Sequence, residues 1–330
     1  MAIIGSDSFR ERLVERRRRV QQAIEVGGDA ARFNNLLTDI DAALARLESE
    51  MFGICESCHE SIEIERLAAD PLLRTCLDHL TADERRALED DLELAARIQG
   101  RLLPERRLAI SGWEAHYQYV PAGAVGGDYC DLVPAVQNGG GFYFLLGDVA
   151  GKGLPASLLM ASLRAIVRTL VEAGLPVGAL VERANRLFCE TALPEHYATL
   201  VCGKASASGE IELCNAGHPP PLLAKGAEVS RLGATGLPIG LFSSGDYPTR
   251  KLQLGPGETL LLYTDGLSES RGPAGEEYGV DRLVSAFSKR RDLPPGDLVA
   301  ACLQDAAAFR TGTARADDLT VLAIRRSNRA

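Results

Sequence analysis

Aspartate residues stand at the ends of predicted strands in four separate parts of the chain, most of them beside glycine. They are Asp128 in GGDYCD before a strand, Asp148 in GDVAGKG and Asp265 in YTDGLSE at the ends of strands, and the pair Asp317 and Asp318 in ARADDLTVL at the opening of the last strand. A single Asp-Gly at a strand end is usually a turn residue, but four such sites favour a shared function. The neighbouring glycines also let the backbone approach a ligand closely.

Carboxylates brought together in one cavity need a cation. Two of them at close range repel by about 4 kcal/mol at an effective dielectric near 20. Oxygen-rich sites select Mg²⁺ or Mn²⁺, and the candidate ligand positions include no sulfur or imidazole. Two such ions about 3.5–4 Å apart can activate a water for in-line displacement at phosphorus, without a serine or cysteine nucleophile. The aspartates therefore predict a two-metal hydrolase site.

The segment LLGDVAGKGLPASLLMASLRA around Asp148 has a rival interpretation as a nucleotide phosphate loop. That motif requires four residues between its first glycine and the Gly-Lys pair, followed by Ser or Thr. Here three residues separate Gly147 from Gly151, and Gly153 follows Lys152. The spacing disfavours a nucleotide. Lys152 could still attract a phosphate group, although a solvated lysine fits equally well.

Three cysteines and a histidine form a second candidate metal site. Cys55-x2-Cys58 and Cys76-x2-His79 are separated by 17 residues, a spacing that lets four donors converge on one tetrahedral Zn²⁺. Thiolates repel each other without a cation, so metal binding would contribute to the folding of this small module. His59 is a weaker rival for the fourth position. Closed four-ligand sites usually serve structure, which favours a structural zinc over a sensory one.

Composition narrows the class of protein. The 330 residues are 46% hydrophobic and 25% charged, which is ordinary for a soluble globular protein of about two domains. A net charge of −9 disfavours binding to nucleic acid or to an anionic membrane. We expect no membrane span, since Arg164 and Arg168 soon interrupt the longest apolar stretch. With no signal peptide and five further scattered cysteines, a cytoplasmic location is expected.

Hydrophobic spacing predicts helices before residue 104. Residues 1–52 read as a coiled-coil helical hairpin that turns at Gly27-Gly28-Asp29, and the same seam could instead pair two chains. In its second helix the seam residues are Phe33, Leu37, Ile40, Leu44, Leu47 and Met51. A linker helix over 81–103 starts at a Thr81–Glu84 capping box and ends before Pro104. Its apolar stripe of Leu88, Leu92, Ala95 and Leu102, which Gln99 interrupts, suits a dimer seam, a lever or a passive spacer.

The rest of the chain alternates short apolar strands with longer helices, which predicts an α+β sandwich. The strands are predicted at 113–120, 142–149, 197–205, 210–216, 259–265 and 319–325, and the helices at 155–173, 177–190, 279–290 and 296–309. Asn215 and His218 in CNAGHPPP could border a substrate, but a rigid proline-rich turn is the favoured interpretation.

Residues 100–326 resemble the SpoIIE/RsbU branch of the PPM metal-dependent serine/threonine phosphatases. The phrases PAGAVGGDYCDL, LLGDVAGKGLPASLLMA, YATLVCGKA, CNAGHPPPLL, GLPIGL, LLYTDGLSES and ADDLTVL occur in family order. The resemblance implies a β-sandwich flanked by helices, with two Mn²⁺ or Mg²⁺ at one edge. It also implies a phosphoserine or phosphothreonine substrate on a STAS-type anti-sigma-factor antagonist.

The resemblance also assigns roles within the predicted two-metal site. Asp148 would bridge the metals, with the Val149 carbonyl as a ligand, and Asp265 and Asp317 would hold the second metal. Asp128 would ligate directly or through water. Asp318 remains the alternative to Asp317. Gly266 would provide the turn after Asp265.

Residues 30–80 resemble the zinc-finger module of DksA/TraR-type proteins, through FGICESCHESI, the preceding hairpin and the CLDHL knuckle. His79 stands where such proteins often have a fourth cysteine, and the hairpin is short, so polymerase binding is not carried over.

The sequence therefore predicts four parts: a hairpin (1–52), a zinc finger (53–80), a linker helix (81–104) and a phosphatase domain (105–330). The predicted function is a protein serine/threonine phosphatase regulated by the N-terminal module, with the heptads favouring a homodimer. The alternative is a non-catalytic or polymerase-binding regulator that uses the phosphatase fold as a scaffold.

Overall fold

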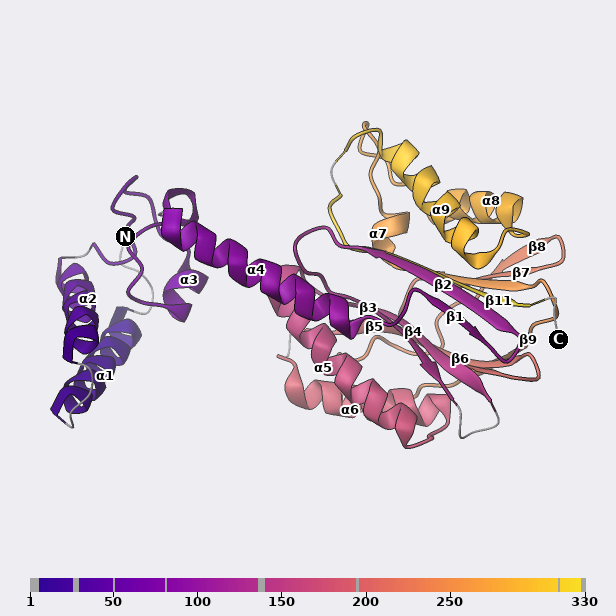
Figure 1. Cartoon of the computed structure of the whole chain (residues 1–330), viewed down its shortest axis with the longest axis horizontal. Helices are drawn as coiled ribbons and strands as arrows, with labels where there is room; N and C mark the ends of the chain where they lie inside the picture. The colour runs from indigo at the N-terminus through magenta and orange to yellow at the C-terminus, as the bar shows by residue number, and fades with distance from the viewer. Residues whose placement is uncertain are drawn as a thin grey trace. The chain divides into compact units, whose positions relative to one another are not determined.

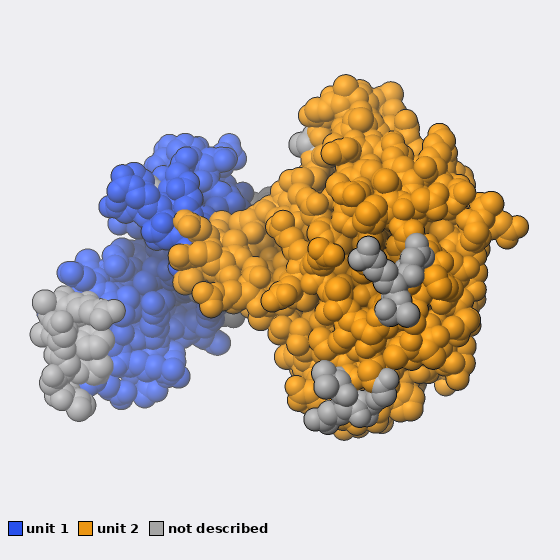
Figure 2. Space-filling view, turned by 45° about the vertical axis from the view of Figure 1, so that its right-hand side comes forward, with its two compact units in different colours: residues 1–91 blue, residues 92–330 orange. Residues whose placement is uncertain are grey.

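The computed structural model forms two compact units, residues 1–91 and residues 92–330, coloured blue and orange in Figure 2. The residues that it describes are 6–25, 30–49, 51–80, 82–135, 140–193, 196–313 and 315–327. The predicted turn at Gly27-Gly28-Asp29 and the predicted helix cap at Thr81 lie outside the described residues.

The first unit begins with two helices, α1 (Ser6–Glu25) and α2 (Ala30–Glu48), which pack on each other. Leu13 and Ile40 have no exposed surface, so the heptad seam is used within one chain, as the simpler of the two interpretations expected. Met51 lies beyond the end of α2 and is half exposed, so its predicted place in the seam is wrong.

The segment after α2 joins the same hydrophobic core. It contains the short helix α3 (Ile64–Ala69) and the 3-10 turn η1 (Leu77–His79). Its side chains that share the core with α1 and α2 are Phe52, Cys55, Ile62, Leu67 and Cys76. The predicted hairpin and zinc finger are therefore packed as one body in this unit.

The second unit is built on two antiparallel sheets. One sheet has the strand order β1-β2-β11-β10-β7-β8, and the other has β3-β4-β5-β6-β9. Their bounds are β1 (Arg107–Ile110), β2 (Trp113–Val120), β3 (Asp128–Pro134), β4 (Gly141–Val149), β5 (Ala198–Ser206), β6 (Glu210–Ala216), β7 (Leu222–Lys225), β8 (Glu228–Arg231), β9 (Arg250–Gln253), β10 (Thr259–Tyr263) and β11 (Leu319–Arg326).

Helices cover the outer faces of both sheets, which confirms the predicted α+β sandwich (Figure 1). The five-stranded sheet is covered by α5 (Gly153–Glu172) and α6 (Val177–Thr191). The six-stranded sheet is covered by α7 (Asp265–Ser268), α8 (Val280–Arg290) and α9 (Pro295–Arg310). Between the sheets lies a core around Trp113, Phe142 and Phe144. Because β4 is enclosed on both faces, its sequence GFYFLLGDV is an almost continuous apolar run.

Helix α5 is long and apolar enough to cross a membrane by length and composition alone. It packs instead against the five-stranded sheet, burying one face in the core. The buried side chains on that face are Ala156, Ser157, Met160, Leu163, Val167, Leu170 and Val171. The apolar character of α5 is therefore that of a core helix.

Helix α4 (Ala82–Leu102) occupies the predicted linker segment, but its burial differs from the prediction. Leu88, a predicted member of the apolar stripe, is 43% exposed, whereas Gln99, the predicted interruption, is 5% exposed. Gln99 is buried because the backbone of the second unit satisfies its amide, as described below.

Candidate functional site

Carboxylates from both sheets meet at one end of the sandwich. Asp128 is the first residue of β3, rather than lying before a strand, and its Cα is paired with that of Asp148 on β4. Asp265, predicted at a strand end, is the first residue of α7, and Thr264 alone separates it from β10. Asp317 and Asp318 precede β11, the neighbour of β10. The four predicted segments are therefore brought together.

Asp128 is held by two threonines that the sequence analysis missed. Its side chain is almost completely buried, and its Oδ2 accepts hydrogen bonds from Thr264 Oγ1 at 3.0 Å and Thr320 Oγ1 at 2.5 Å. The Thr320 amide donates in turn to Thr264 Oγ1 at 2.9 Å. Both threonines belong to the six-stranded side, so these bonds join the two sheets at the site. The sequence offered no local signal for these two partners, because the bonds run between segments that are far apart in the chain.

Burial and mutual repulsion raise the pKa values of Asp128, Asp148 and Asp265. Burial raises the pKa of Asp148 to about 8, together with the charges of Asp265, Asp317 and Asp318, while Lys152 partly offsets them. Burial and the charge of Asp317 also raise the pKa of Asp265. A cluster that resists ionisation in this way is stabilised by a bound cation, and its oxygen donors suit Mg²⁺ or Mn²⁺.

The neighbouring residues Asp317 and Asp318 have different surroundings. Asp318 is buried, and its two carboxylate oxygens accept hydrogen bonds from the backbone amides of Ala122 at 2.8 Å and Gly127 at 2.7 Å. Asp317 is partly exposed, and its Oδ2 lies 3.2 Å from Lys152 Nζ. The carboxylate of Asp318 thus shapes the loop before β3, whereas that of Asp317 accepts from the Asp318 amide and pairs with Lys152 at the more exposed side of the site.

Lys152 borders a cavity of about 380 Å³ beside these acids. Besides Asp317, its ammonium contacts the Ala316 carbonyl at 2.6 Å. Arg315 lines the same cavity, so two cationic side chains stand next to the carboxylates. This arrangement gives a phosphate group positive partners at the edge of an acidic site.

Glycines let the backbone segments of the site approach one another. A Cβ added to Gly127 would lie 2.7 Å from the Val149 carbonyl oxygen and 3.3 Å from Asp148 Oδ1. A Cβ at Gly266 would lie 1.8 Å from the carbonyl oxygen of Asp318. Side chains at these two positions would push the candidate ligands apart, which accounts for glycine there.

Gln99 of α4 binds the loop that leads to Asp128. Its Nε2 donates to the Gly126 carbonyl at 2.7 Å, and its Oε1 accepts from the Gly126 amide at 3.1 Å. Both polar groups of one backbone residue are thereby paired with a single buried side chain. The linker helix therefore fixes the backbone two residues before a candidate metal ligand.

Asn215 and His218 form a closed turn. The fully buried Asn215 accepts from the His218 amide at 2.8 Å through Oδ1, and its Nδ2 donates to the His218 carbonyl at 3.1 Å. The ring of His218 pairs with Thr199 Oγ1 at 2.8 Å, and burial lowers its pKa to about 3. These contacts support the favoured interpretation of a rigid turn.

The candidate zinc ligands lie together in the first unit. The donor atoms of Cys55, Cys58, Cys76 and His79 are all within 4.8 Å of one another, with Cys58 Sγ 3.7 Å from Cys76 Sγ. Two thiolates bound tetrahedrally at 2.3 Å would be about 3.8 Å apart, so the donor set fits Zn²⁺. Cys76 Sγ is 3.2 Å from His79 Nδ1, while the rival His59 is exposed and outside this group.

The pKa values of the cysteine thiols are consistent with cation binding. Burial opposes ionisation of Cys55, but backbone N–H donors outweigh it and lower its pKa to about 6. Burial and the neighbouring thiols Cys55 and Cys58 raise the pKa of Cys76. The second effect is the repulsion that a bound cation removes.

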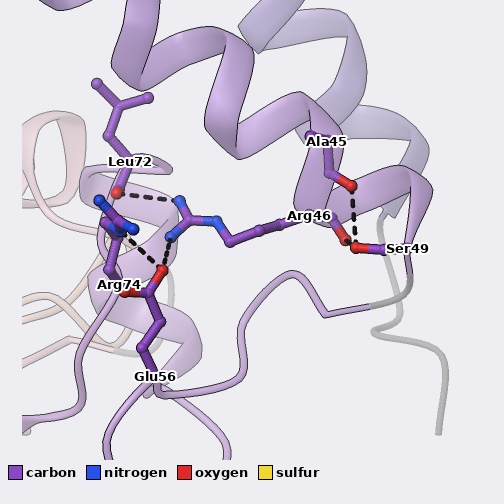
Figure 3. Close-up of polar contacts among 6 residues, drawn as sticks. All are labelled: Ala45, Arg46, Ser49, Glu56, Leu72 and Arg74. Atoms are coloured by element: carbon purple, nitrogen blue, oxygen red, sulfur yellow. Dashed lines mark hydrogen bonds and ion pairs between the residues drawn. The ribbon is translucent and has the colours of Figure 1, made fainter.

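Figure 3 shows how the two knuckles are tied to α2. Arg46 reaches from α2 to the Leu72 carbonyl at 3.2 Å and to Glu56 Oε1 at 3.3 Å. Arg74 Nε donates to the same Glu56 oxygen at 2.7 Å. Glu56 adjoins Cys55, and Arg74 stands two residues before Cys76. One ion-pair network therefore joins the helical hairpin to both halves of the candidate zinc site.

Comparison with known proteins decides the family. A family model described as stage II sporulation protein E (SpoIIE) matches residues 138–327, more than half of the chain. The chain belongs to the SpoIIE family. The predicted resemblance to the SpoIIE/RsbU branch is confirmed by this match.

Relatives of this SpoIIE-family chain match part of it. The protein IcfG of Synechocystis sp. is 26% identical over 267 residues, 72% of this chain and 42% of IcfG. The phosphoserine phosphatase RsbU of Bacillus subtilis is 25% identical over 60% of this chain and 59% of RsbU. The chain thus spans about half the length of these curated relatives. The SiaA-PP2C domain of Pseudomonas aeruginosa has the same fold, with a TM-score of 0.65 and 23% identity over 75% of this chain and 99% of that domain.

A separate similarity concerns the N-terminal part of the chain. The RNA polymerase-binding transcription factor DksA of Haemophilus influenzae is 40% identical over 55 residues, which is 17% of this chain and 38% of DksA. This short match agrees with the predicted resemblance of the cysteine module to DksA/TraR-type proteins.

Proposed function

We propose that this chain is a metal-dependent protein phosphatase that hydrolyses phosphoserine or phosphothreonine. The observation that carries the proposal is the convergence of Asp128, Asp148, Asp265 and Asp317 at one end of the sandwich, with burial and mutual repulsion raising the pKa of Asp148 to about 8. Membership of the SpoIIE family and the similarity to the phosphoserine phosphatase RsbU support this chemistry.

Asp148, the Val149 carbonyl, Asp265 and Asp317 would hold two Mn²⁺ or Mg²⁺, with Asp128 ligating directly or through water. When bound, such ions supply an activated water and neutralise charge on the phosphoryl oxygens. The chain itself keeps these ligands in place. Thr264 and Thr320 orient Asp128, and glycine at positions 127 and 266 permits the close backbone approach.

The cationic side chains of Lys152 and Arg315, which line the cavity beside the acids, suit the approach of a phosphate. Lys152, already paired with Asp317, can exchange part of that contact for a phosphoryl oxygen as substrate enters. Asp318 keeps its role in holding the backbone before β3 and is not assigned to a metal.

The finer parts of the proposal follow from the family. The substrate would be a STAS-type anti-sigma-factor antagonist in the cytoplasm. The hairpin, a finger with one structural Zn²⁺ held by Cys55, Cys58, Cys76 and His79, and the linker helix would regulate the phosphatase domain. Since α1 and α2 use their seam on each other, we assign a homodimer contact to α4, where Leu94 and Ile98 are exposed one turn apart.

The test is phosphatase activity of the purified full chain on p-nitrophenyl phosphate and on a phosphoserine peptide, with and without Mn²⁺. Asp148→Asn and Asp265→Asn should each reduce the Mn²⁺-dependent rate by at least about a hundredfold, since each removes a charged ligand. The control Asp292→Asn changes an exposed carboxylate after α8 and should retain the rate. Equal rates in all four proteins would reject the mechanism and favour a non-catalytic scaffold.

A further inference from the structure

Exposed apolar side chains lie on chain segments next to the carboxylate site. We call this group the apolar ledge. Its members are 42–64% exposed although they are leucine or phenylalanine, and they come from the start of α5, the segment after α6 and the loop before β9. They are Leu154, Leu158, Leu193, Leu237, Leu241 and Phe242. Several exposed apolar side chains near one site mark a place where another molecule binds.

Backbone hydrogen bonds connect the ledge to the candidate metal ligands. Val149 is paired with Ala198 at the start of β5, and the Ala150 amide donates to the Tyr197 carbonyl at 2.9 Å. Ala198 and Ile239 exchange two further bonds, at 2.8 and 2.9 Å. Neighbouring strands are about 4.8 Å apart, so the loop around Ile239 lies roughly 10 Å from Val149.

The loop of the ledge is anchored through its backbone, which leaves its side chains exposed. The buried Asn185 accepts from the Gly240 amide at 2.9 Å, and its Nδ2 donates to the Phe242 carbonyl at 2.8 Å. Leu237 and Phe242 line a cavity of about 340 Å³, large enough for an apolar side chain of a partner. At the other end of the ledge, Leu154 lines the cavity that also contains Lys152 and Asp317.

We propose that the apolar ledge docks the phosphoprotein substrate by covering an apolar face next to its phosphorylated residue. This inference rests on the proposed phosphatase function and defines the kind of substrate that the site selects. A phosphate group looks alike on every protein, so contacts to it cannot distinguish substrates. The ledge supplies that distinction, because burying its side chains against a polar face would give little affinity.

The position of the ledge favours a substrate over other occupants. A permanent second copy seated on it would also cover the cavity that Leu154 lines together with Lys152 and Asp317, which would block a phosphate from the acids there. An anionic lipid surface is disfavoured by the net charge of −9 and by the adjacent carboxylates. A transient protein partner that brings the phosphate with it satisfies both constraints.

Two phosphoserine peptides of equal length and charge provide the test, one with Leu, Ile and Phe around the phosphoserine and one with Ser, Gly and Gln there. The full chain with Mn²⁺ should hydrolyse the apolar peptide with a kcat/KM about tenfold higher, mainly through KM, because one or two buried side chains give about that factor. Leu237→Ser combined with Phe242→Ser should bring the ratio of the two peptides close to one. The matched variant, Leu237→Met with Phe242→Leu, should keep it.

Equal kcat/KM for both peptides in the unaltered chain, or a preference that survives the double serine variant, would overturn the inference. A change of oligomeric state in the serine variant, measured by sedimentation, would also overturn it by assigning the ledge to a second copy. Hydrolysis of p-nitrophenyl phosphate distinguishes a failure of the docking inference from a failure of the proposed phosphatase function. If it proceeds without a peptide preference, only the docking inference fails; if it never proceeds, the proposed function fails as well.

Discussion

At the scale of single residues, charge placement sets the chemistry of the second unit. Asp128, Asp148 and Asp265 all have raised pKa values, each with burial as the first cause. A fold that buries acids without counter-charges is destabilised by their ionisation, unless a cation binds. Such a cost is retained where it serves a function, because the same arrangement binds divalent ions tightly.

This electrostatic cost predicts the pH dependence of stability in the metal-free protein. The folded-state pKa of Asp148, about 8, lies above its ordinary value of 3.8, so the folded state binds more protons between these limits. Stability of the metal-free second unit should therefore fall as pH rises from about 4 to about 8. Asp148→Asn should raise the Tm by a few degrees at pH 8 and by less at pH 5, since 1 kcal/mol moves Tm by about 2–4 °C.

Fluorescence of Trp113, the single tryptophan, reports this transition because the residue is buried between the sheets. Measurements in EDTA should be compared with measurements in Mn²⁺, which should raise the Tm of the unaltered chain more at pH 8 than at pH 5. A Tm difference between the two proteins that is independent of pH would contradict the assignment of a raised pKa to Asp148.

At the scale of elements, hydrophobic patterning predicted the long helices and the apolar strands. Short strands such as β7 and β8 were missed, because four residues give no period to detect. The seven-residue β3 lay outside the predicted strand ranges, and the strand predicted to end at Asp265 ends at Tyr263, since turn chemistry does not fix such boundaries. The aspartates could be predicted from their motifs. The hydroxyl partners Thr264 and Thr320 depend on contacts between sheets, which no local pattern contains.

Gln99 illustrates why periodicity misjudged α4. A polar residue in a helical stripe predicts a break in packing, yet this amide pairs with both polar groups of Gly126. Replacing it by Met keeps the length of the side chain but leaves a buried N–H and C=O without their partner. We expect Gln99→Met to destabilise the second unit by about 1–3 kcal/mol and to weaken Mn²⁺-dependent activity.

Urea unfolding followed by Trp113 fluorescence measures this stability, and p-nitrophenyl phosphate hydrolysis measures the activity. The matched variant Arg101→Met changes an exposed residue on the same helix and should leave both close to those of the unaltered chain. If Gln99→Met behaves like Arg101→Met, the contact with Gly126 does not position the loop.

At the scale of the whole molecule, the two units have separate cores and separate candidate metal sites with different donors. The first unit has thiolate and imidazole donors, which suit Zn²⁺, and the second has carboxylates, which suit Mg²⁺ or Mn²⁺. The short finger of the first unit is stabilised by a core that it shares with α1 and α2, and Cys55 and Cys76 are buried members of that core. Removing a zinc ion bound by these donors would leave repelling thiols inside that core.

Zinc removal should therefore unfold the first unit while the second stays folded. Cys58→Ser in the full chain removes one proposed ligand, and we expect the amides of α1 and α2 to lose hydrogen-exchange protection by at least about tenfold. Protection of β3–β6 should not change, because those strands belong to other cores. The matched variant Cys189→Ser, a half-buried cysteine of α6 outside the cluster, should leave α1 and α2 protected. Full protection of both helices in Cys58→Ser would mean that the hydrophobic seam of Leu13 and Ile40 holds the hairpin without metal, because an intact seam is then the remaining source of its stability.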